Sequence, residues 1–131
     1  MNKQRRNRTL TMLLLAGIVP VVCAAPAEPS NVHAQGDRLV DGKGMTLYIF
    51  DKDVKGSGES ACDESCLKLW PAVVVDAASS MDPPYGSIST ANGVRQLTHK
   101  GRPLYYFVKD KKPGDSQGDG VKDVWHVARP G

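Results

Sequence analysis

The sequence lacks the short motifs that mark the common enzyme classes. It has no phosphate-cradling GxxxxGK[ST] loop, no HExxH metalloprotease helix and no GxSxG nucleophile turn. Serine, histidine and aspartate all occur, but at no spacing that predicts a catalytic triad. Haem attachment through CxxCH is also excluded, because Cys62 and Cys66 are separated by three residues and no histidine follows. We therefore predict no enzymatic activity.

Long apolar runs are scarce, and the one at residues 10–22 is too short for a comfortable membrane span, which takes about 20 residues. Basic residues precede this run and alanines follow it, so residues 1–24 are interpreted as a bacterial-type signal peptide with an approximate cleavage point. Cys23 is a candidate for lipid attachment, but Val22 stands where a lipoprotein signal has Gly, Ala or Ser, which disfavours anchoring. We expect a periplasmic or secreted protein with no transmembrane span after cleavage.

An excess of positive charge is also absent once the signal peptide is removed. The full chain has 17 Lys+Arg and 14 Asp+Glu, a formal charge of +3. The four charged residues of residues 1–24 are all basic, so the mature chain has 13 basic and 14 acidic residues, a formal charge of −1. This balance gives no support to nucleic-acid binding. The expected partner is an unidentified envelope component or a small ligand.

What the sequence does contain is an internal repeat. GMTLYIFDKD at residues 44–53 recurs as GRPLYYFVKD at residues 101–110, with six identities in ten positions. Such self-similarity is typical of a duplicated supersecondary unit. Alternate side chains of a strand face opposite ways, and both faces of these two strands are apolar. We therefore expect both strands to lie inside sheet structure that is covered on two sides.

Turn signals place each motif in the outgoing strand of a β-hairpin, the first one reversing at Asp-Gly in residues 41–44. We predict a mainly β fold: a small single domain of two related β-hairpin repeats with one short Cys-bearing helix over residues 61–70, capped by Ser60. A flexible leader at residues 25–36 precedes the domain at residues 37–131. Its repeats cover about residues 37–76 and 93–129, and the connector at 76–92 is expected to be partly ordered through Tyr85 and Ile88.

Aromatic residues are few, with two phenylalanines and two tryptophans, so both tryptophans are predicted to lie in the core. They follow the two motifs at similar distances and are interpreted as equivalent residues. The two motif aspartates come where the strands end, so we expect them to accept backbone N–H groups rather than to act as a catalytic pair. The residues singled out as structural or ligand-binding are Tyr48, Phe50, Asp53, Trp70, Tyr105, Phe107, Asp110, Trp125 and His126.

Both copies fit the pattern Yx[FWY]xxD, and the chain therefore resembles the bacterial secreted repeat of unknown function family, predicted lipoproteins with that motif. The likeness runs from about Leu39 to Ala128 and includes the cysteine pair, Trp70-Pro71 and Trp125-His126. It implies an exported, β-rich domain of tandem repeats and no particular reaction. The surface expected to be used is formed by the loops at the repeat ends, around Asp53, Asp110 and His126.

Cys62 and Cys66 are expected to form a disulfide, as two cysteines of a small exported domain usually do. The alternative is a copper site in which both thiolates and a histidine, His126 or His99, hold Cu(I). Two hypotheses for function follow. The first is a non-enzymatic binding or accessory module of the cell envelope without a cofactor. The alternative is a periplasmic redox or copper-binding protein.

Overall fold

The computed structural model describes Gly17 and residues 31–76 and 81–131. Apart from Gly17, the predicted signal peptide lies outside the described residues, as do Cys23 and the first part of the predicted leader. In the part of the chain that the structure describes, no helix has the length and apolar character needed to cross a membrane.

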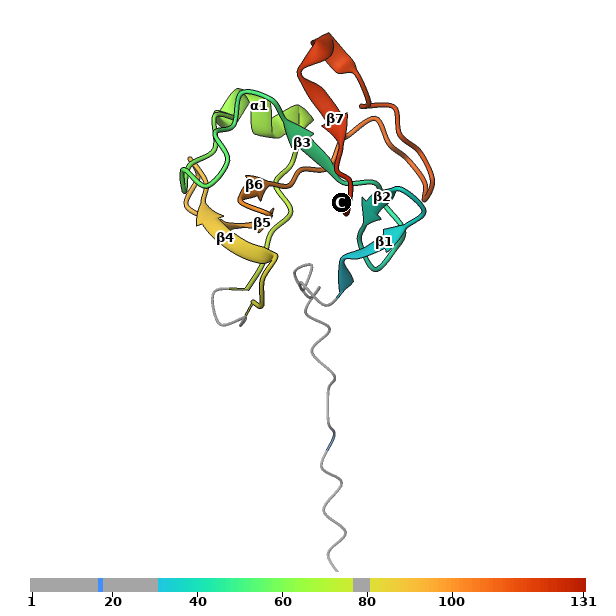
Figure 1. The fold of residues 1–131 in the computed structure, drawn as a ribbon, viewed down its shortest axis with the longest axis horizontal. Helices are drawn as coiled ribbons and strands as arrows, with labels where there is room; N and C mark the ends of the chain where they lie inside the picture. The colour runs from blue at the N-terminus through green and yellow to red at the C-terminus, as the bar shows by residue number, and fades with distance from the viewer. Residues whose placement is uncertain (1–16, 18–30, 77–80) are drawn as a thin grey trace, which may run out of the picture.

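The fold is mainly β, as predicted, and its short strands form three small antiparallel sheets (Figure 1). The first sheet pairs β1 with β2, the second pairs β3 with β7, and the third has the order β4-β5-β6. The strands are β1 (His33–Gln35), β2 (Arg38–Val40), β3 (Tyr48–Phe50), β4 (Tyr85–Ser89), β5 (Arg95–His99), β6 (Arg102–Pro103) and β7 (Trp125–Val127). The helical elements are α1 (Glu64–Leu69) and the 3-10 turn η2 (Val121–Asp123).

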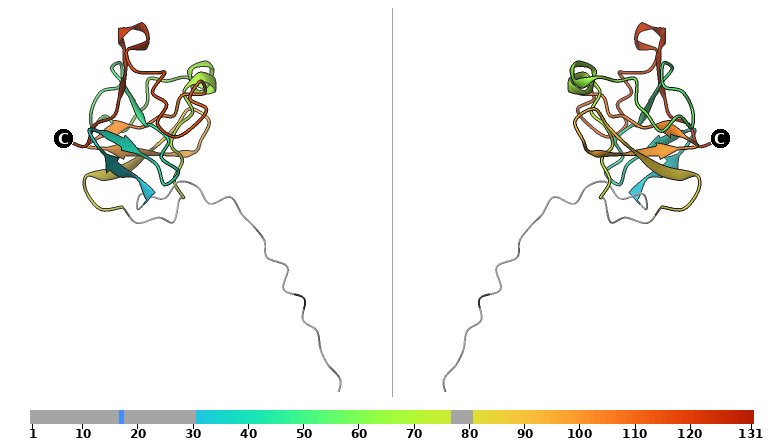
Figure 2. Two further views of the ribbon diagram at one scale, coloured as in Figure 1. Left: turned by 90° about the vertical axis from the view of Figure 1, so that its right-hand side faces the viewer. Right: turned by 90° about the vertical axis from the view of Figure 1, so that its left-hand side faces the viewer.

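The two copies of the motif pair with each other at their tyrosines. The Tyr48 N–H donates to the Tyr105 carbonyl at 2.8 Å, and the Tyr105 N–H donates to the Tyr48 carbonyl at 3.0 Å. This reciprocal pair is the centre of an approximate two-fold relationship between the repeats. Figure 1 shows its consequence, with the β1–β2 hairpin and the β4–β5–β6 sheet on opposite sides of β3. In Figure 2, α1 lies at the opposite end of the domain from β1.

Backbone hydrogen bonds occur in matched sets, which identifies equivalent residues. The Leu47 N–H donates to the Leu39 carbonyl at 3.1 Å, and the Leu104 N–H donates to the Leu97 carbonyl at 3.0 Å. In the same way, the Ala128 N–H donates to Leu47 at 2.8 Å and the Val73 N–H donates to Leu104 at 3.1 Å. The equivalent pairs are Leu39 and Leu97, Leu47 and Leu104, and Ala128 and Val73.

Two hydrophobic clusters cover opposite faces of the motif strands, as the sequence predicts. The first is aromatic and holds Tyr48, Phe50, Cys62, Leu67, Trp70, Tyr105, Phe107, Trp125 and Val127. The second is aliphatic and holds Val32, Leu39, Leu47, Val73, Val75, Leu97, Leu104 and Ala128. Alternate side chains of each motif therefore enter different clusters.

The repeats begin earlier than the sequence analysis places them. β1 lies inside the predicted flexible leader at residues 25–36 and pairs with β2, while the adjacent Val32 is buried in the aliphatic cluster. β4 lies inside the predicted connector, starts at Tyr85, and pairs with β5 over five residues. Both strands are short and polar, so they show little of the apolar alternation that predicts a strand.

The helix is shorter than predicted and has a different N-cap. Asp63 caps α1 by accepting a hydrogen bond from the Cys66 N–H at 2.9 Å. The proposed cap, Ser60, instead accepts the Cys62 N–H at 3.1 Å and shares a 2.6 Å hydrogen bond with the Tyr105 hydroxyl. The Cys62–Cys66 disulfide is confirmed, with its first cysteine placed before the helix.

Candidate functional site

Each motif tyrosine bonds to the aspartate of the other motif. The Tyr48 hydroxyl donates to Asp110 at 2.6 Å, and the Tyr105 hydroxyl donates to Asp53 at 2.7 Å. Both tyrosines are fully buried. The exchange of partners ties the two repeats together inside the core, since neither repeat supplies a complete pair.

The second oxygen of each aspartate organises the loop that follows. Asp53 Oδ1 accepts the Ala61 N–H at 2.6 Å, and Asp110 Oδ1 accepts the Gln117 N–H at 2.8 Å. This is the turn-fixing arrangement expected from the sequence.

Burial favours the protonated forms of Asp53, Tyr48 and Tyr105 and so raises the pKa of each. It raises the pKa of Asp53, while hydrogen bonds from Tyr105 and Ala61 and the charge of Arg102 oppose the shift. Burial and the aspartate partners raise the pKa of Tyr48 and Tyr105 well above the usual value of a phenol. Both phenols therefore remain protonated hydrogen-bond donors, which makes these pairs structural links rather than proton-transfer groups.

Four aromatic rings stack in the space between the two tyrosines. Phe50 stacks on Trp125 at 4.1 Å between ring centroids, and Phe107 stacks on Trp70 at 4.1 Å. The two indoles stack on each other at 3.8 Å with an interplanar angle of 2°. Each tryptophan thus contacts the phenylalanine of the other repeat, and the two tryptophans occupy equivalent places.

A cavity of about 530 Å³ lies where β3 and β7 meet the turn between β5 and β6. Its volume is within the range of small-ligand sites. A smaller hollow of about 120 Å³ shares Asp119, Val127 and Arg129 with it. The cavity is lined by Ile49, Lys55, His99, Lys100, Arg102, Asp119, His126, Val127, Ala128, Arg129 and Gly131.

The cavity lies where the two repeats differ in sequence. In the motif alignment Ile49 corresponds to Tyr106, whose hydroxyl donates to Asp41 at 2.8 Å. Strand register identifies the counterpart of His99. Val40 pairs with Thr46, and Thr98 pairs with Pro103, which aligns with Thr46 in the motif. Val40 and Thr98 are therefore equivalent, and so are the residues that follow them, Asp41 and His99. At one of the two equivalent places between the repeats, the Tyr106 phenol therefore bonds to Asp41. At the other place, Ile49 and the His99 imidazole line open space.

Three further lining residues are polar where their counterparts are apolar. Arg102 corresponds to Met45 in the motif alignment. With Ala128 matched to Val73 by backbone bonds, His126 corresponds to Pro71 and Arg129 corresponds to Val74. These three polar side chains all belong to the second repeat. The repeated core does not require them.

His99 is the most deeply buried titratable group of the cavity. Its side chain is 7% exposed and its ring lies 5.3 Å from the Tyr85 ring. Burial and the charge of Lys100 lower its pKa, so the imidazole is neutral at pH 7. Within residues 31–76 and 81–131, no hydrogen bond joins this imidazole to another group.

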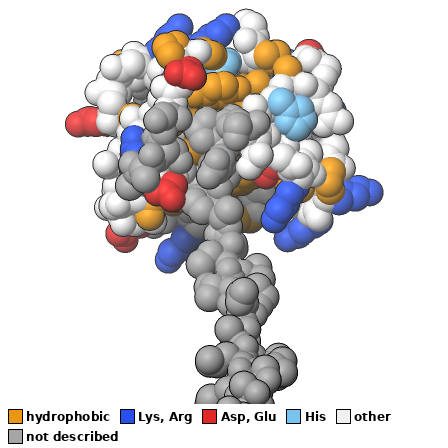
Figure 3. All heavy atoms as spheres, turned by 90° about the horizontal axis from the view of Figure 1, so that it is seen from below, with side chains coloured by type: hydrophobic (Ala, Val, Ile, Leu, Met, Phe, Trp, Pro, Cys, Tyr) orange, Lys and Arg blue, Asp and Glu red, His pale blue; other side chains and the backbone are white. Residues whose placement is uncertain are grey.

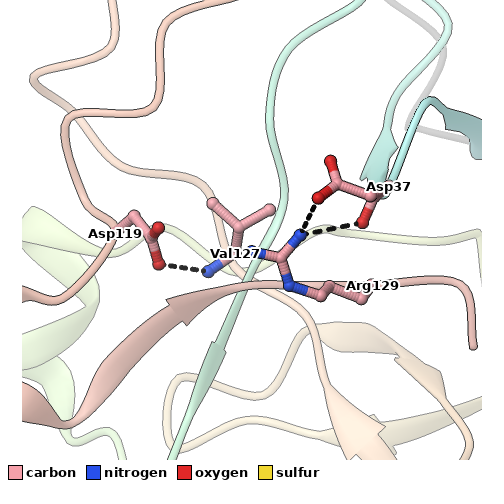
Figure 4. A network of polar contacts seen from close by, with 4 residues as sticks. All are labelled: Asp37, Asp119, Val127 and Arg129. Carbon is pink, nitrogen blue, oxygen red and sulfur yellow. Dashed lines mark hydrogen bonds and ion pairs between the residues drawn. The ribbon is translucent and has the colours of Figure 1, made fainter.

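His126 and Arg129 are held at the cavity by acidic partners. The His126 Nε2 atom lies 2.7 Å from Asp51 Oδ2. Figure 4 shows Arg129 turned toward Asp37, with its Nη1 atom 2.5 Å from Oδ2 and 3.2 Å from the backbone carbonyl. Asp119 accepts the Val127 N–H at 3.2 Å in the same view. Among the described residues, the ion pairs within 4 Å are these two, and they leave Lys55, Lys100 and Arg102 unpaired.

The structure separates the residues that the sequence analysis grouped. Asp53 and Asp110 lie inside the domain, while His126 lines the cavity. Of the residues that line the cavity, the sequence singled out only His126 and, as a copper ligand, His99; the others, Arg102 among them, were missed. The signal was present in the alignment, because Ile49 opposite Tyr106 and Met45 opposite Arg102 are differences between repeats that otherwise agree.

The two cysteines belong to the aromatic cluster and are joined to each other. A copper site made from Cys62, Cys66 and His126 would require reduction of that disulfide, because thiolates are the ligands of Cu(I). In the part of the chain described, no group of three or more His, Cys, Asp or Glu side chains is arranged to hold a metal.

Comparison with protein families gives one result. The model described as "secreted repeat of unknown function" matches residues 32–74 and 86–129. These ranges begin close to β1 and β4, in agreement with the repeat boundaries in the structure. Neither the curated proteins nor the solved structures contain a match.

Proposed function

Because the chain belongs to the family of secreted repeats of unknown function, we propose that it is an exported, non-enzymatic binding module whose ligand site is the cavity beside His99 and His126. The duplicated core has the role of a scaffold. The cavity, formed where one repeat has departed from the other, has the role of the recognition site.

The observation that carries this proposal is a difference between the two motifs: Ile49 stands at the position that Tyr106 occupies in the other copy. The two repeats keep the same buried tyrosines, tryptophans and aspartates, which are the residues that hold the fold together. Folding does not explain why one of the two equivalent places is filled by Tyr106 and Asp41, which come from different repeats, while the other leaves about 530 Å³ open. Ligand binding does explain it, since concave sites with a few polar groups are the usual places for small molecules.

A binding role suits this site better than catalysis. The Tyr48–Asp110 and Tyr105–Asp53 pairs are out of reach of a substrate, because both tyrosines are fully buried. A substrate would have to break into the core to reach them. Beside the exposed His126–Asp51 pair, the described residues that line the cavity include no serine, threonine or cysteine that the histidine could activate.

A small ligand is favoured over a nucleic acid or an anionic membrane as the partner. On the face seen from below, the acidic and basic side chains of the described residues are interspersed where they are visible (Figure 3), which is unlike the single-sign surface that binds a polyanion. Export to the periplasm or to the medium is the location we propose, with lipid attachment at Cys23 disfavoured by Val22.

A fragment screen by two-dimensional NMR tests the proposal. With ¹⁵N-labelled exported protein, we expect at least one fragment of a mixed small-molecule set to shift the amide signals of Val127 and Ala128. The variant Ile49→Tyr, which copies the other repeat, should abolish these shifts while the rest of the spectrum remains that of a folded domain. Leu69→Tyr, at a side chain that is 52% exposed on α1, is the control. Fragments that bind equally well to Ile49→Tyr, or a set that leaves these signals unmoved, would contradict the proposal.

A further inference from the structure

We infer that the ligand of this cavity is a small organic anion, with an oxyanion group, carboxylate or phosphate, held by Arg102 and His99 and an apolar part lying against Ile49. The inference rests on the proposed binding function and names its ligand class.

Positive charge gathers around the opening although the chain as a whole has little of it. Lys55, Lys100, Arg102 and Arg129 line the cavity, and Asp119 is the acidic side chain among the lining residues. Arg129 is paired with Asp37, but no ion pair within 4 Å joins the other three cations to a described residue. Unpaired cations around a concave site attract and hold anions, because the low-dielectric walls strengthen the field inside.

Strand pairing sets Arg102 and His99 side by side. They are direct partners in the antiparallel β5–β6 pair. Side chains of directly paired residues project from the same face of a sheet, and both of these line the cavity. A planar guanidinium suits a carboxylate or phosphate, since its N–H groups can bond to two oxygens at once. The neighbouring imidazole can donate a further hydrogen bond to the same group.

The His99 ring has no hydrogen-bond partner among the described residues, and its nitrogens are not sealed from solvent, since Gln96 Oε1 is the buried side-chain atom without a partner in that part of the chain. The ring N–H is therefore available to a ligand in the cavity that His99 lines. An oxyanion in the cavity would accept the ring N–H, and its negative charge would favour the imidazolium form. Lys100 opposes protonation of the ring. The other charged side chains of the lining are Lys55, Arg102 and Arg129, which are cationic, and Asp119, which is anionic.

The apolar part of the lining indicates an organic anion rather than a simple inorganic one. Ile49, Val127 and Ala128 contribute to the cavity wall beside the cations. Its volume, about 530 Å³, is much larger than one oxyanion needs. A ligand with an anionic group at one end and an apolar body at the other would use both kinds of surface.

A matched fragment series separates charge from shape. Benzoate, benzamide and benzylamine have nearly the same size and carry a negative, zero and positive charge. Phenyl phosphate replaces the carboxylate by a phosphate, and inorganic phosphate lacks the organic part. Amide shifts of Val127 and Ala128 give each dissociation constant. We expect benzoate or phenyl phosphate to bind roughly tenfold or more tightly than benzamide, and benzylamine not to bind. Added NaCl should weaken binding of the anion.

Two variants assign the effect to the cavity. Arg102→Met copies the residue of the other repeat and should weaken anion binding roughly tenfold or more. Lys112→Met, which removes the counterpart of Lys55 away from the cavity, has the same change in net charge and should leave binding unchanged. A spectrum of Arg102→Met with the dispersion of the parent protein shows that the variant is folded.

The outcomes distinguish this inference from the function on which it rests. If benzamide binds in the cavity as tightly as benzoate, the anion inference is overturned and the binding function stands. If inorganic phosphate binds as tightly as phenyl phosphate, the organic part of the inference is overturned. If none of the five probes shifts these signals at millimolar concentration, the inference is overturned, and the wider fragment set decides whether the binding function falls with it.

Discussion

The hydroxyl of Tyr48 donates a 2.6 Å hydrogen bond to the carboxylate of Asp110, which ends the other copy of the repeated motif. The symmetry-related bond joins Tyr105 to Asp53 at 2.7 Å. The tyrosine and aspartate of one motif therefore never bond to each other; each completes the partner copy. A motif with this chemistry makes two repeats depend on each other, which explains why it occurs twice in one small domain.

Gly118 fills the narrow space between Trp70 and Tyr48. Its N–H donates to the Tyr48 hydroxyl at 3.2 Å, and a Cβ atom placed on it would lie 2.8 Å from ring atoms of both residues. The rings cannot withdraw, because Trp70 is stacked on Trp125 and the Tyr48 ring packs edge-on against Trp70. We predict that Gly118→Ala lowers the free energy of unfolding by about 1–3 kcal/mol in a urea titration.

The control for this substitution is Gly86→Ala. A Cβ atom on Gly86 would meet only the Thr98 hydroxyl oxygen, at 3.0 Å, and that side chain can rotate. Its cost should stay within about 0.5 kcal/mol. An equal cost at both glycines would show that the tight packing around Tyr48 is not what stabilises the core.

The disulfide closes a very short loop at the edge of the aromatic cluster. Joining residues four apart restricts the unfolded chain by about 2 kcal/mol in the chain-entropy model. We predict that the double variant Cys62→Ala/Cys66→Ala still folds and loses about this amount in its free energy of unfolding. A double variant that does not fold at all would show that the bridge has a larger structural role than the loop length allows.

Thiol titration of the exported protein separates the binding module from the copper alternative. With Cys62 and Cys66 joined, neither should react before a reductant is added. Two reactive thiols, together with stoichiometric Cu(I) binding that is lost in Cys62→Ser, would favour the copper protein instead.

The buried His99 makes stability depend on pH. Its pKa is lowered in the folded state by burial and by Lys100, whereas in the unfolded chain it is near 6.5. As the pH falls below about 6.5 the unfolded state takes up a proton first, so stability is lost on acidification until the folded pKa is reached. We predict that His99→Gln loses less stability than the parent between neutral and mildly acidic pH.

The difference in stability between the parent protein and His99→Gln at each pH reports the contribution of His99 alone. Asp53 acts in the opposite direction, because a raised pKa lets the folded state take up a proton before the unfolded chain does. Its effect is the same in the parent and in His99→Gln and cancels in the difference. Urea titrations at several pH values give both curves, and parallel curves would rule out a neutral, buried His99.

The residues that hold the core could be predicted from the sequence because they recur. Tyr48 and Tyr105, like the two tryptophans, stand at matching places in a chain with few aromatic residues, so duplication and burial could both be inferred. The apolar character of both strand faces predicted the two clusters. The presence of Cys62 and Cys66 in a small domain with a predicted signal peptide predicted their bond.

The exchange of partners between Tyr48 and Asp110 could not be predicted. Spacing in the motif fixes where Asp53 stands in its own strand, but the register between two strands depends on the whole fold. β1 and β4 were missed because strands of polar and small residues give no periodic signal. The cavity was missed because it requires knowing that Asp41 and His99 are equivalent, which only strand pairing shows.

A double-mutant cycle on Tyr48→Phe and Asp110→Ala tests the central claim most directly, with Tyr48→Phe and Asp53→Ala as the matched pair within one motif. The exchange of partners predicts a coupling energy of about 1 kcal/mol or more between Tyr48 and Asp110, and less than about 0.5 kcal/mol between Tyr48 and Asp53. Equal coupling in both cycles, or stronger coupling within the motif, would contradict the claim that each repeat completes the other.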